Sequence, residues 1–484
     1  MSVQTPNILF LFSDQHRRDA VGAYGAPLCH TPAIDGLASS GMRFAQAFTP
    51  IALCSPARAS LLTGLYPHNH GQLANMGNFN GVFDTQVLDR RGYPQLLRQA
   101  GYSVNYVGKW HLPREGDCGL WGFDNWHTAR EYLEDVSDMG LDGDRAVEVQ
   151  RLEWGGEAPF CGRAALRGED LQEAWAADRT VELLDKLAPA DQPFMIFTSF
   201  FGPHFPYAVP APYDTMYDPA QVERWINFDE SFADKPLVQQ KEMLRWNASH
   251  LTWPDWQRVI AHYWGYCTYI DDQIRRVLDR LDALGLAENT VVIYTSDHGD
   301  MLGSHRLFNK GYNMYDETYR VPLVVRWPGR TPPNSQCDRF VSLVDLMPTL
   351  LEIGGAALPG VPDLSGTLDG RSLLPLLSGD RTHDWPDDVY AESHGYESAL
   401  CSQRMVRTAS WKYIYNPCFE DELYDVESDP GELNNVASKL GYKHVLRRMK
   451  ARLVRWLQRT HDTIAEDDSW KGSAYDLYLS GRER

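Results

Sequence analysis

The hydrophobic positions of the chain form short unbroken runs that alternate with longer stretches of helical periodicity. Residues 7–12 read Asn-Ile-Leu-Phe-Leu-Phe and are followed by Ser13 and Asp14. Unbroken apolar runs of this length are typical of strands that are buried on both faces of a parallel sheet. Further runs of this kind lie at 194–201, 290–295 and 321–326. Helical patterns lie between the runs, at 31–40, 94–100, 179–187 and about 256–284.

Because strands alternate with helices, the pattern predicts an α/β fold with a large central, mostly parallel sheet sandwiched by helices. Residues 354–379 are rich in Gly, Pro, Leu and Asp, which indicates a connector. Short strand patterns follow it at 389–392, 399–408 and 411–415, and then a long amphipathic helix near 439–460. We therefore predict a large α/β domain at 1–375 and a smaller C-terminal α+β domain at 376–484, with a short antiparallel sheet and a long helix.

Two segments in the middle of the chain, at about 115–175 and 210–255, allow no secondary-structure prediction. Both are rich in Trp, Gly, Asp and Glu and show no clear periodicity. Long irregular segments of this kind often form functional loops.

Composition and charge narrow the classes of partner. Hydrophobic residues make up 43% of the 484 residues and charged residues 23%, as in a soluble globular protein. Apolar runs of about 18 residues are absent, and residues 1–6 lack the pattern of a signal peptide, so we predict a cytoplasmic location and no membrane partner. The formal net charge of −19 opposes binding to nucleic acid or anionic membranes. The eight cysteines form no CxxC pair, so a zinc cluster is not expected.

The most specific chemical signal is the segment 53–64, which reads Leu-Cys-Ser-Pro-Ala-Arg-Ala-Ser-Leu-Leu-Thr-Gly. Pro56 is typical of a first helical turn, so we expect Cys54 at a helix N-terminus, where an anion is stabilised. Arg58 lies on the same face and can hydrogen-bond to whatever Cys54 becomes. The alternative is a buried core cysteine beside a surface arginine. A tyrosine-phosphatase loop is excluded, because it needs arginine six residues after the cysteine, where Ser60 stands.

Polar residues follow the ends of three predicted strands. Asp14 follows the first, His204 the second, and Asp297 with His298 the third. In parallel sheets such residues gather in one crevice beyond the carboxyl ends of the strands. A hard divalent cation needs several oxygen ligands, so Asp14 and Asp297 are the candidate carboxylates, and Gln15 and His298 can add a carbonyl and a ring nitrogen. The alternatives are a strand-end cap for Asp14 and a supporting position for Gln15.

The segment 53–64 resembles the type I sulfatases of the alkaline-phosphatase-like superfamily. The resemblance implies that Cys54 is oxidised after translation to formylglycine, whose hydrated aldehyde is the nucleophile. It also implies one divalent metal ion, with the ligands Asp14, Gln15, Cys54 in its modified form, Asp297 and His298. Type I sulfatases commonly carry Asp-Asp at the first site, whereas this chain has Asp-Gln. We expect Ca²⁺, with Mn²⁺ as the alternative, because losing a carboxylate and gaining an imidazole makes the site softer.

Three more segments match the family in its chain order, at 107–112, 202–206 and 309–311. The resemblance implies that Lys109 contacts the nucleophile and the sulfate, and that His111 accepts the proton whose removal expels sulfate. It further implies that His204 contacts the transferred group, and that Lys310 protonates or stabilises the leaving-group oxygen. The alternative for each is a packed histidine or a solvated lysine. Beyond this set, His68 and His70 are candidates for the pocket wall.

These residues predict a hydrolase that cleaves aryl, small-molecule or carbohydrate sulfate monoesters. One hydroxyl of the hydrated aldehyde attacks sulfur, and deprotonation of the other expels sulfate from a covalent sulfo-enzyme intermediate. Lysines, histidines and a metal neutralise the charge as it shifts. The Asp-Gln pair also resembles relatives that hydrolyse phosphonate monoesters and phosphate diesters, which is the alternative reaction. A catalytically inactive binding protein is a third hypothesis, which would hold if Cys54 stayed a thiol.

The resemblance also implies the partners of the protein. They are a small-molecule or saccharide sulfate ester as substrate and a formylglycine-generating enzyme for maturation. The C-terminal tail at 469–484 carries Trp470, Tyr475, Leu477 and Tyr478 among polar residues, so we predict that it acts as an arm in a homo-oligomer.

Overall fold

The structure is a computed structural model that describes residues 5–466, apart from 27, 84–86, 88–91, 139–145, 154–156, 357–367, 381–383, 397–398 and 418. None of the helices within these residues has the length and apolar character needed to cross a membrane. The tail at 469–484, which we predict to act as an oligomerisation arm, lies outside the described residues.

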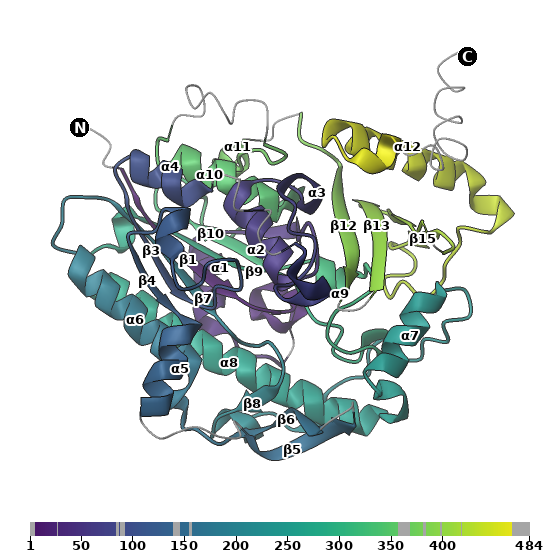
Figure 1. The fold of residues 1–484 in the computed structure, drawn as a ribbon, viewed down its shortest axis with the longest axis horizontal. Helices are drawn as coiled ribbons and strands as arrows, with labels where there is room; N and C mark the ends of the chain where they lie inside the picture. Colours follow the sequence, from purple (N-terminus) through teal and green to yellow (C-terminus); the bar gives the residue numbers. More distant parts are fainter. Residues whose placement is uncertain are drawn as a thin grey trace.

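A large, mostly parallel sheet forms the centre of the molecule (Figure 1). Its strand order is β11-β2-β10-β9-β1-β7-β3-β4, and β9, β1, β7, β3 and β4 run parallel to one another. The strand expected at 321–326 is present as β10, but it runs antiparallel to both of its neighbours. The strands are β1 (Asn7–Ser13), β2 (Met42–Phe48), β3 (Ser103–Gly108), β4 (Asn125–Thr128), β7 (Phe194–Phe200), β9 (Thr290–Ser296), β10 (Leu323–Arg326) and β11 (Ser335–Ser342).

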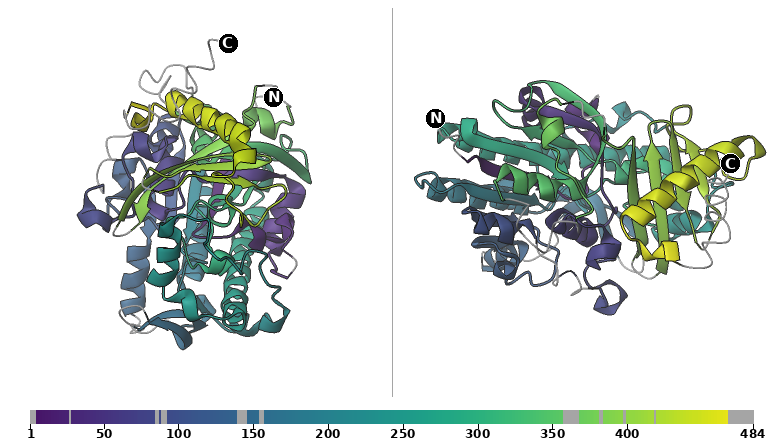
Figure 2. Two further views of the ribbon diagram at one scale, coloured as in Figure 1. Left: turned by 90° about the vertical axis from the view of Figure 1, so that its right-hand side faces the viewer. Right: turned by 90° about the horizontal axis from the view of Figure 1, so that it is seen from above.

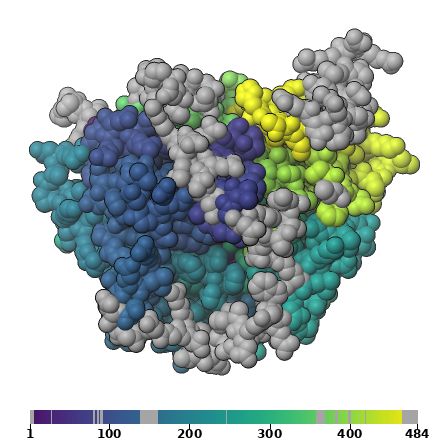
Figure 3. Space-filling view, viewed as in Figure 1, coloured from purple at the N-terminus to yellow at the C-terminus, as the bar shows by residue number. Residues whose placement is uncertain are grey.

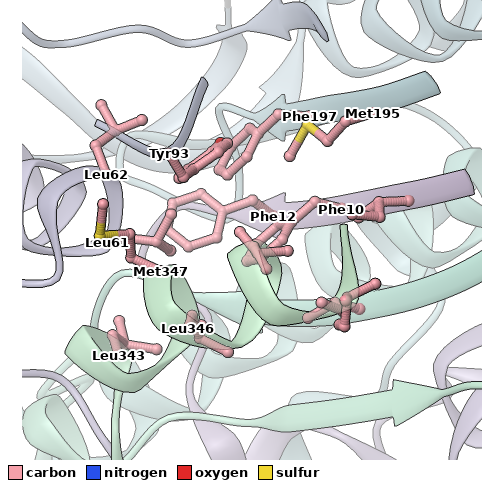
Figure 4. Close-up of a cluster of buried hydrophobic side chains, with 14 of the residues drawn as sticks. Phe10, Phe12, Leu61, Leu62, Tyr93, Met195, Phe197, Leu343, Leu346 and Met347 are labelled. Atoms are coloured by element: carbon pink, nitrogen blue, oxygen red, sulfur yellow. The ribbon is translucent and has the colours of Figure 1, made fainter. Parts of the chain in front are cut away.

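Helices cover both faces of this sheet, because successive side chains of each strand point to opposite faces. Phe10 and Phe12 of β1 share a core with α2, α4, α10 and α11 on one face (Figure 4). Leu9 and Leu11 share a second core with α1, α6 and α8 on the other face. The helices are α1 (Pro32–Ser40), α2 (Cys54–Thr63), α4 (Tyr93–Gln99), α6 (Gln172–Leu187), α8 (Trp253–Ala283), α10 (Leu346–Ile353) and α11 (Leu374–Leu377). The predicted α/β sandwich is confirmed.

The C-terminal region forms a four-stranded antiparallel sheet with one long helix, as expected. The strands β12 (Asp388–Tyr396), β13 (Ala399–Thr408), β14 (Trp411–Tyr415) and β15 (Glu422–Asp425) follow one another in order. One face of the sheet packs on α12 (Lys443–Arg459), and the other face packs against the large domain (Figure 2). The small sheet is therefore a middle layer. The predicted domain boundary at 375/376 stays a prediction.

The two middle segments without a prediction contain several short elements. They hold β4 and α5 (Ala129–Asp138), the strands β5 (Ala146–Glu153) and β6 (Glu157–Ala164), and α7 (Leu237–Arg245). β5 and β6 pair with β8 (Tyr207–Val209) in a separate three-stranded sheet. Two further helices, α3 (Pro67–His70) and α9 (Asp316–Tyr319), have four residues each. A four-residue helix is too short to show a hydrophobic period, and Trp and charged residues interrupt the period in the longer elements.

A buried histidine ties α3 to the C-terminal region. His68 Nδ1 lies 2.7 Å from Glu392 Oε2, and Nε2 lies 3.0 Å from the carbonyl oxygen of Thr460. Both oxygens can only accept, so the ring donates from both nitrogens and carries a positive charge. Burial opposes this charge, but the carboxylates of Glu392 and Asp462 outweigh it and raise the pKa of His68 to about 9. α3 and the C-terminal region are thus joined by a charged contact.

Replacement of His68 should therefore destabilise the protein in a pH-dependent manner. A histidine whose pKa rises on folding contributes its full stabilisation below the unfolded value of about 6.5, and loses it as the pH rises through the folded value. The shift to a pKa of about 9 corresponds to about 3 kcal/mol. We expect His68→Gln to lower the free energy of unfolding, measured by urea titration, strongly near pH 6 and weakly near pH 10. An equal loss at both pH values would contradict a charged His68.

Candidate active site

Cys54 is the first residue of α2, as the sequence predicts, and the whole helix is buried. The helix ends at Gly64, which has a positive φ of 67° that glycine adopts without strain. Cys54 Sγ lies 3.3 Å from His298 Nε2 and 3.6 Å from Asp14 Oδ1. Burial and Asp14 raise the pKa of the thiol, but the surrounding cations outweigh both and lower it well below its usual value. These cations are Lys109, Lys310 and His298. The site therefore stabilises an anion at position 54.

Two carboxylates meet at the carboxyl ends of neighbouring strands. Asp14 follows β1 and Asp297 follows β9, and the parallel register pairs Ser13 with Ser296 directly before them. Arg58 Nη2 lies 2.9 Å from Asp14 Oδ2, and Nε lies 3.3 Å from Asp297 Oδ2. Arg58 also donates to Ser199 Oγ and to the carbonyl oxygen of Lys109. Arg58 thus holds the two carboxylates together at the base of the site.

The cluster around Cys54 fits a divalent cation. Asp14, Cys54, Asp297 and His298 each offer a ligand atom, and these atoms lie within 4.8 Å of one another. Asp297 Oδ2 is buried and accepts no hydrogen bond among the residues described. Burial and the charge of Asp14 raise the pKa of Asp297 to about 7, as expected for two carboxylates that share one small volume. His298 Nδ1 is held by the carbonyl oxygen of Gly299 at 2.7 Å, which leaves Nε2 as the ligand atom.

Gln15 lies beside this cluster and makes two side-chain contacts. Its amide nitrogen donates to Asp300 Oδ2 at 2.5 Å, and its amide oxygen accepts from Lys310 Nζ at 2.8 Å. The amide oxygen is therefore engaged by a lysine in this structure, and the role of Gln15 as a metal ligand stays a prediction. The contacts give Gln15 a second role, which is to position Lys310.

Two lysines bring positive charge to the same place, and a neutral histidine lies beside one of them. Lys109 follows β3, and its Nζ lies 2.7 Å from Asp14 Oδ2. Lys310 Nζ lies 3.2 Å from His204 Nε2, whose ring is held through Nδ1 by the carbonyl oxygen of Phe205 at 2.6 Å. Burial, Lys310 and Lys109 lower the pKa of His204 to about 4, so this ring is neutral. Its Nε2 therefore accepts a hydrogen bond from the Lys310 ammonium group rather than donating one.

His111 is only partly placed by the structure. The side chain of the preceding Trp110 is buried in the core, and the side chain of Lys109 points to Asp14. His111 itself is half-buried, has a positive φ of 54°, and has no hydrogen-bond partner for Nδ1 among the described residues. The predicted proton transfer by His111 stays a prediction.

His68 and His70 do not join the cluster. His68 is engaged by Glu392 and Thr460 as described above, and His70 Nε2 lies 3.0 Å from Ser60 Oγ of α2. Burial lowers the pKa of His70 to about 3, so it is a neutral packing residue. Nearness to Cys54 in the sequence does not bring these side chains to the metal-binding cluster, because their ring nitrogens are engaged by Glu392, Thr460 and Ser60 instead.

Sequence reasoning missed two side chains that support the site. Asp300, which reads as a loop carboxylate, is fully buried and accepts hydrogen bonds from Gln15, Tyr207 and the backbone of Leu302. Ser199, inside β7, accepts the hydrogen bond from Arg58. Asp300 follows Asp297 by three residues in the same loop, and this spacing could have indicated a carboxylate near the site. A serine within an apolar strand gives no such indication.

Comparison with known proteins agrees with this arrangement. The model of the Sulfatase family matches residues 6–356. The chain belongs to the sulfatase family. A second family model, for the C-terminal region of N-sulphoglucosamine sulphohydrolase, matches residues 303–459. Membership makes the protein a sulfuric ester hydrolase, within the alkaline-phosphatase-like superfamily that its motifs predict.

Individual relatives extend over nearly the whole chain. The uncharacterized sulfatase YidJ of Escherichia coli K12 is 30% identical over 95% of this chain and 88% of its own length. An N-acetylglucosamine-6-O-sulfatase of Bacteroides thetaiotaomicron is 28% identical over 96% of this chain and 87% of its own length. Among solved structures, the phosphonate monoester hydrolase of Agrobacterium radiobacter superposes with a TM-score of 0.79 and 28% identity, over 94% of this chain and 96% of that chain. The fold is thus shared with enzymes named for two different ester classes.

Loss of one carboxylate of the cluster should abolish metal binding. We expect Asp297→Asn to weaken the affinity for Ca²⁺ and Mn²⁺ by more than about 100-fold, beyond what loss of a supporting partner costs, because it removes a charged ligand. Asp300→Asn is the matched control, since its oxygens lie outside the four-residue cluster, and it should retain the metal. The measurement is the metal content after dialysis together with calorimetric titration. Equal metal content in both variants would refute the assigned cluster.

Proposed function

We propose that the protein is a formylglycine-dependent sulfatase that hydrolyses small-molecule or saccharide sulfate monoesters through a covalent sulfo-enzyme intermediate. The carrying observation is the position of Cys54, which opens a buried helix 3.3 Å from His298 Nε2 and 3.6 Å from Asp14 Oδ1. A buried core cysteine would not be surrounded by three cationic side chains and two carboxylates. The inactive-scaffold hypothesis is disfavoured for the same reason.

Different residues around Cys54 would neutralise the negative charge of the ester at different steps of the reaction. Formylglycine at position 54, formed by a formylglycine-generating enzyme, would supply a hydroxyl that attacks sulfur and a second hydroxyl whose deprotonation expels sulfate. A divalent metal, Ca²⁺ or alternatively Mn²⁺, would be held by Asp14, Asp297 and His298 and would polarise the sulfate oxygens. Lys109, held by Asp14, lies where it can bind the anionic ester. We assign His111 as the base that removes the second hydroxyl's proton.

Lys310 and His204 are assigned to the leaving group. The neutral His204 accepts a hydrogen bond from Lys310 through Nε2, and Gln15 accepts a second one. An ammonium group has three protons, so Lys310 keeps one for the oxygen that departs from sulfur. The two acceptors fix the direction of that proton, which favours protonation of the leaving group over simple ion pairing.

A second candidate function is hydrolysis of phosphonate monoesters or phosphate diesters with the same machinery. Two observations favour it. The residue after Asp14 is Gln15 and the residue after Asp297 is His298, and the fold superposes on a phosphonate monoester hydrolase with a TM-score of 0.79. A sulfate monoester and a phosphodiester both carry a single negative charge, so the electrostatics of the site admit either one.

The first test is mass spectrometry of the tryptic peptide that contains Cys54, on protein co-produced with a formylglycine-generating enzyme. We expect the mass loss that corresponds to conversion of the thiol to an aldehyde, in wild type and not in Cys54→Ala. The same preparation should hydrolyse an aryl sulfate faster than an aryl phosphonate, and Cys54→Ala should hydrolyse neither. An unmodified thiol in an active enzyme would overturn the proposed nucleophile, and a faster aryl phosphonate rate would establish the second candidate function.

The role of Lys310 predicts a dependence on the leaving group. Lys310→Met should lower kcat/KM for an alkyl or saccharide sulfate by roughly 10²- to 10⁴-fold, because these alkoxides depart only when protonated. The loss should be much smaller for nitrophenyl sulfate, whose leaving group is stable as an anion. Lys109→Met is the matched control and should lower both rates by similar factors. A loss of equal size for both substrates with Lys310→Met would contradict the role assigned here.

A further inference from the structure

The helix α12 is strongly basic in a chain that is strongly acidic. Its 17 residues include seven of the 46 Lys and Arg and contain neither Asp nor Glu, whereas the whole chain has a net charge of −19. Five of the seven are arginines, whose planar guanidinium group binds sulfate and phosphate oxygens through two hydrogen bonds at once. This concentration of charge is a feature that the catalytic chemistry does not use.

The basic residues lie on the solvent side of the helix. Val445, Met449, Leu453 and Leu457 are buried against the sheet β12–β15, so the opposite side faces outward. In Figures 2 and 3 the helix lies on the outside of the molecule, as the yellow ribbon and the yellow atoms. The exposed cations are Lys443, Arg447, Arg448, Arg455 and Arg459.

Within the described residues, four of these exposed cations form neither a salt bridge nor a cation–π contact, whereas Arg459 lies over the ring of Trp456. Lys443, Arg447, Arg448 and Arg455 form no salt bridge with any carboxylate that the structure describes. Two other cations of the same helix are paired, since Arg452 contacts Asp387 and Asp388, and Lys450 contacts Asp421. These four, which we call the basic face, form no salt bridge among the described residues, so their charge is available for an external anion. Arg455 also acts on Asp387 at longer range and helps Arg452 to lower the pKa of that carboxyl.

The basic face also conflicts with the local rules of helix stability. Lys443 and Arg447 are four residues apart, and like charges at this spacing destabilise a helix. Lys443 lies in the first turn, which contains no acidic residue, although the helix dipole disfavours a cation there. Conflicts of this kind are expected where a surface serves binding rather than stability.

The C-terminal end of α12 lies beside the helix that follows the nucleophile helix. His68 and Asn69 of α3 both contact the carbonyl oxygen of Thr460, the residue directly after α12. α3 in turn packs on α2 through the contact between His70 and Ser60. α12, α3 and α2 therefore form one continuous, packed series (Figure 1). The C-terminal end of α12 is thus connected to the nucleophile helix through α3.

We propose that the basic face of α12 binds a sulfated polysaccharide outside the catalytic pocket and so holds a polymeric substrate on the enzyme. This inference rests on the proposed function. A membrane is disfavoured because the apolar side of α12 is already packed on the sheet and cannot insert into lipid. A rigid duplex would bring the acidic remainder of the chain against further negative charge, whereas a flexible glycan contacts only the narrow basic face.

The test is a triple variant, Arg447→Gln, Arg448→Gln and Arg455→Gln, compared with wild type for binding to heparin. Loss of three cations should weaken the affinity at least about 10-fold and reduce its dependence on salt concentration, because fewer counterions are released. The matched control carries Arg258→Gln, Arg275→Gln and Arg276→Gln on α8, which removes the same charge from exposed positions of another long helix. The control should bind heparin as wild type does.

Kinetics and competitor ligands complete the test. The triple variant should show a raised KM for a sulfated polysaccharide and unchanged kinetics on a small aryl sulfate. Unchanged heparin affinity, equal binding to unsulfated dextran, or tighter binding to duplex DNA or phosphatidylserine vesicles than to heparin would overturn the proposal. If heparin binding falls as expected while wild type hydrolyses no sulfate ester, then the proposed function fails and the polyanion-binding surface stands.

Discussion

The site depends on two buried carboxylates that the parallel pairing of β1 and β9 forces together. Asp14 and Asp297 follow paired residues of adjacent strands, so neither can move away without breaking the centre of the sheet. Two like charges at this separation are unfavourable unless cations stand between them. Arg58 contacts both, and Lys109 contacts Asp14. Removing one partner from a buried pair of this kind costs about 3–5 kcal/mol, so the arginine is as much part of the fold as of the chemistry.

The remaining features of the site supply the partners that the two buried carboxylates, Asp14 and Asp297, require. The buried position of α2 puts its positive N-terminus, and with it Cys54, against Asp14 and His298. The loops after β3, β7 and β9 deliver Lys109, His204 and His298 to the same edge of the sheet. Gln15 then links the carboxylate side to the leaving-group side, because its amide contacts Asp300 with one end and Lys310 with the other. One edge of the sheet therefore positions the anionic nucleophile at Cys54, the metal-binding cluster and the proton donor Lys310.

The C-terminal region contains positive charge in two different settings, one buried and paired and the other exposed. His68 is largely buried, paired with Glu392 and held on both ring nitrogens, so its charge joins α3 to the C-terminal region. The basic face of α12 is exposed and unpaired among the described residues, so its charge is directed outward. His68 lies beside the C-terminal end of α12, since it contacts Thr460, the residue directly after the helix. A single region can thus bind the large domain through one side and a polyanion through the other.

The sequence by itself determined the repeating strands and helices, the start of α2 at Cys54 and the carboxylates at strand ends, because these depend on periodicity and on residues adjacent in the chain. The family motifs added the remaining site residues in their order. Only the tertiary structure decided the reversal of β10, the buried roles of Asp300 and Ser199, the contact of Gln15 with Lys310, and the partners of His68 and His70, which are Glu392 and Ser60. The physical reason is that strand direction, burial and hydrogen-bond partners arise between residues far apart in sequence, where no local pattern records them.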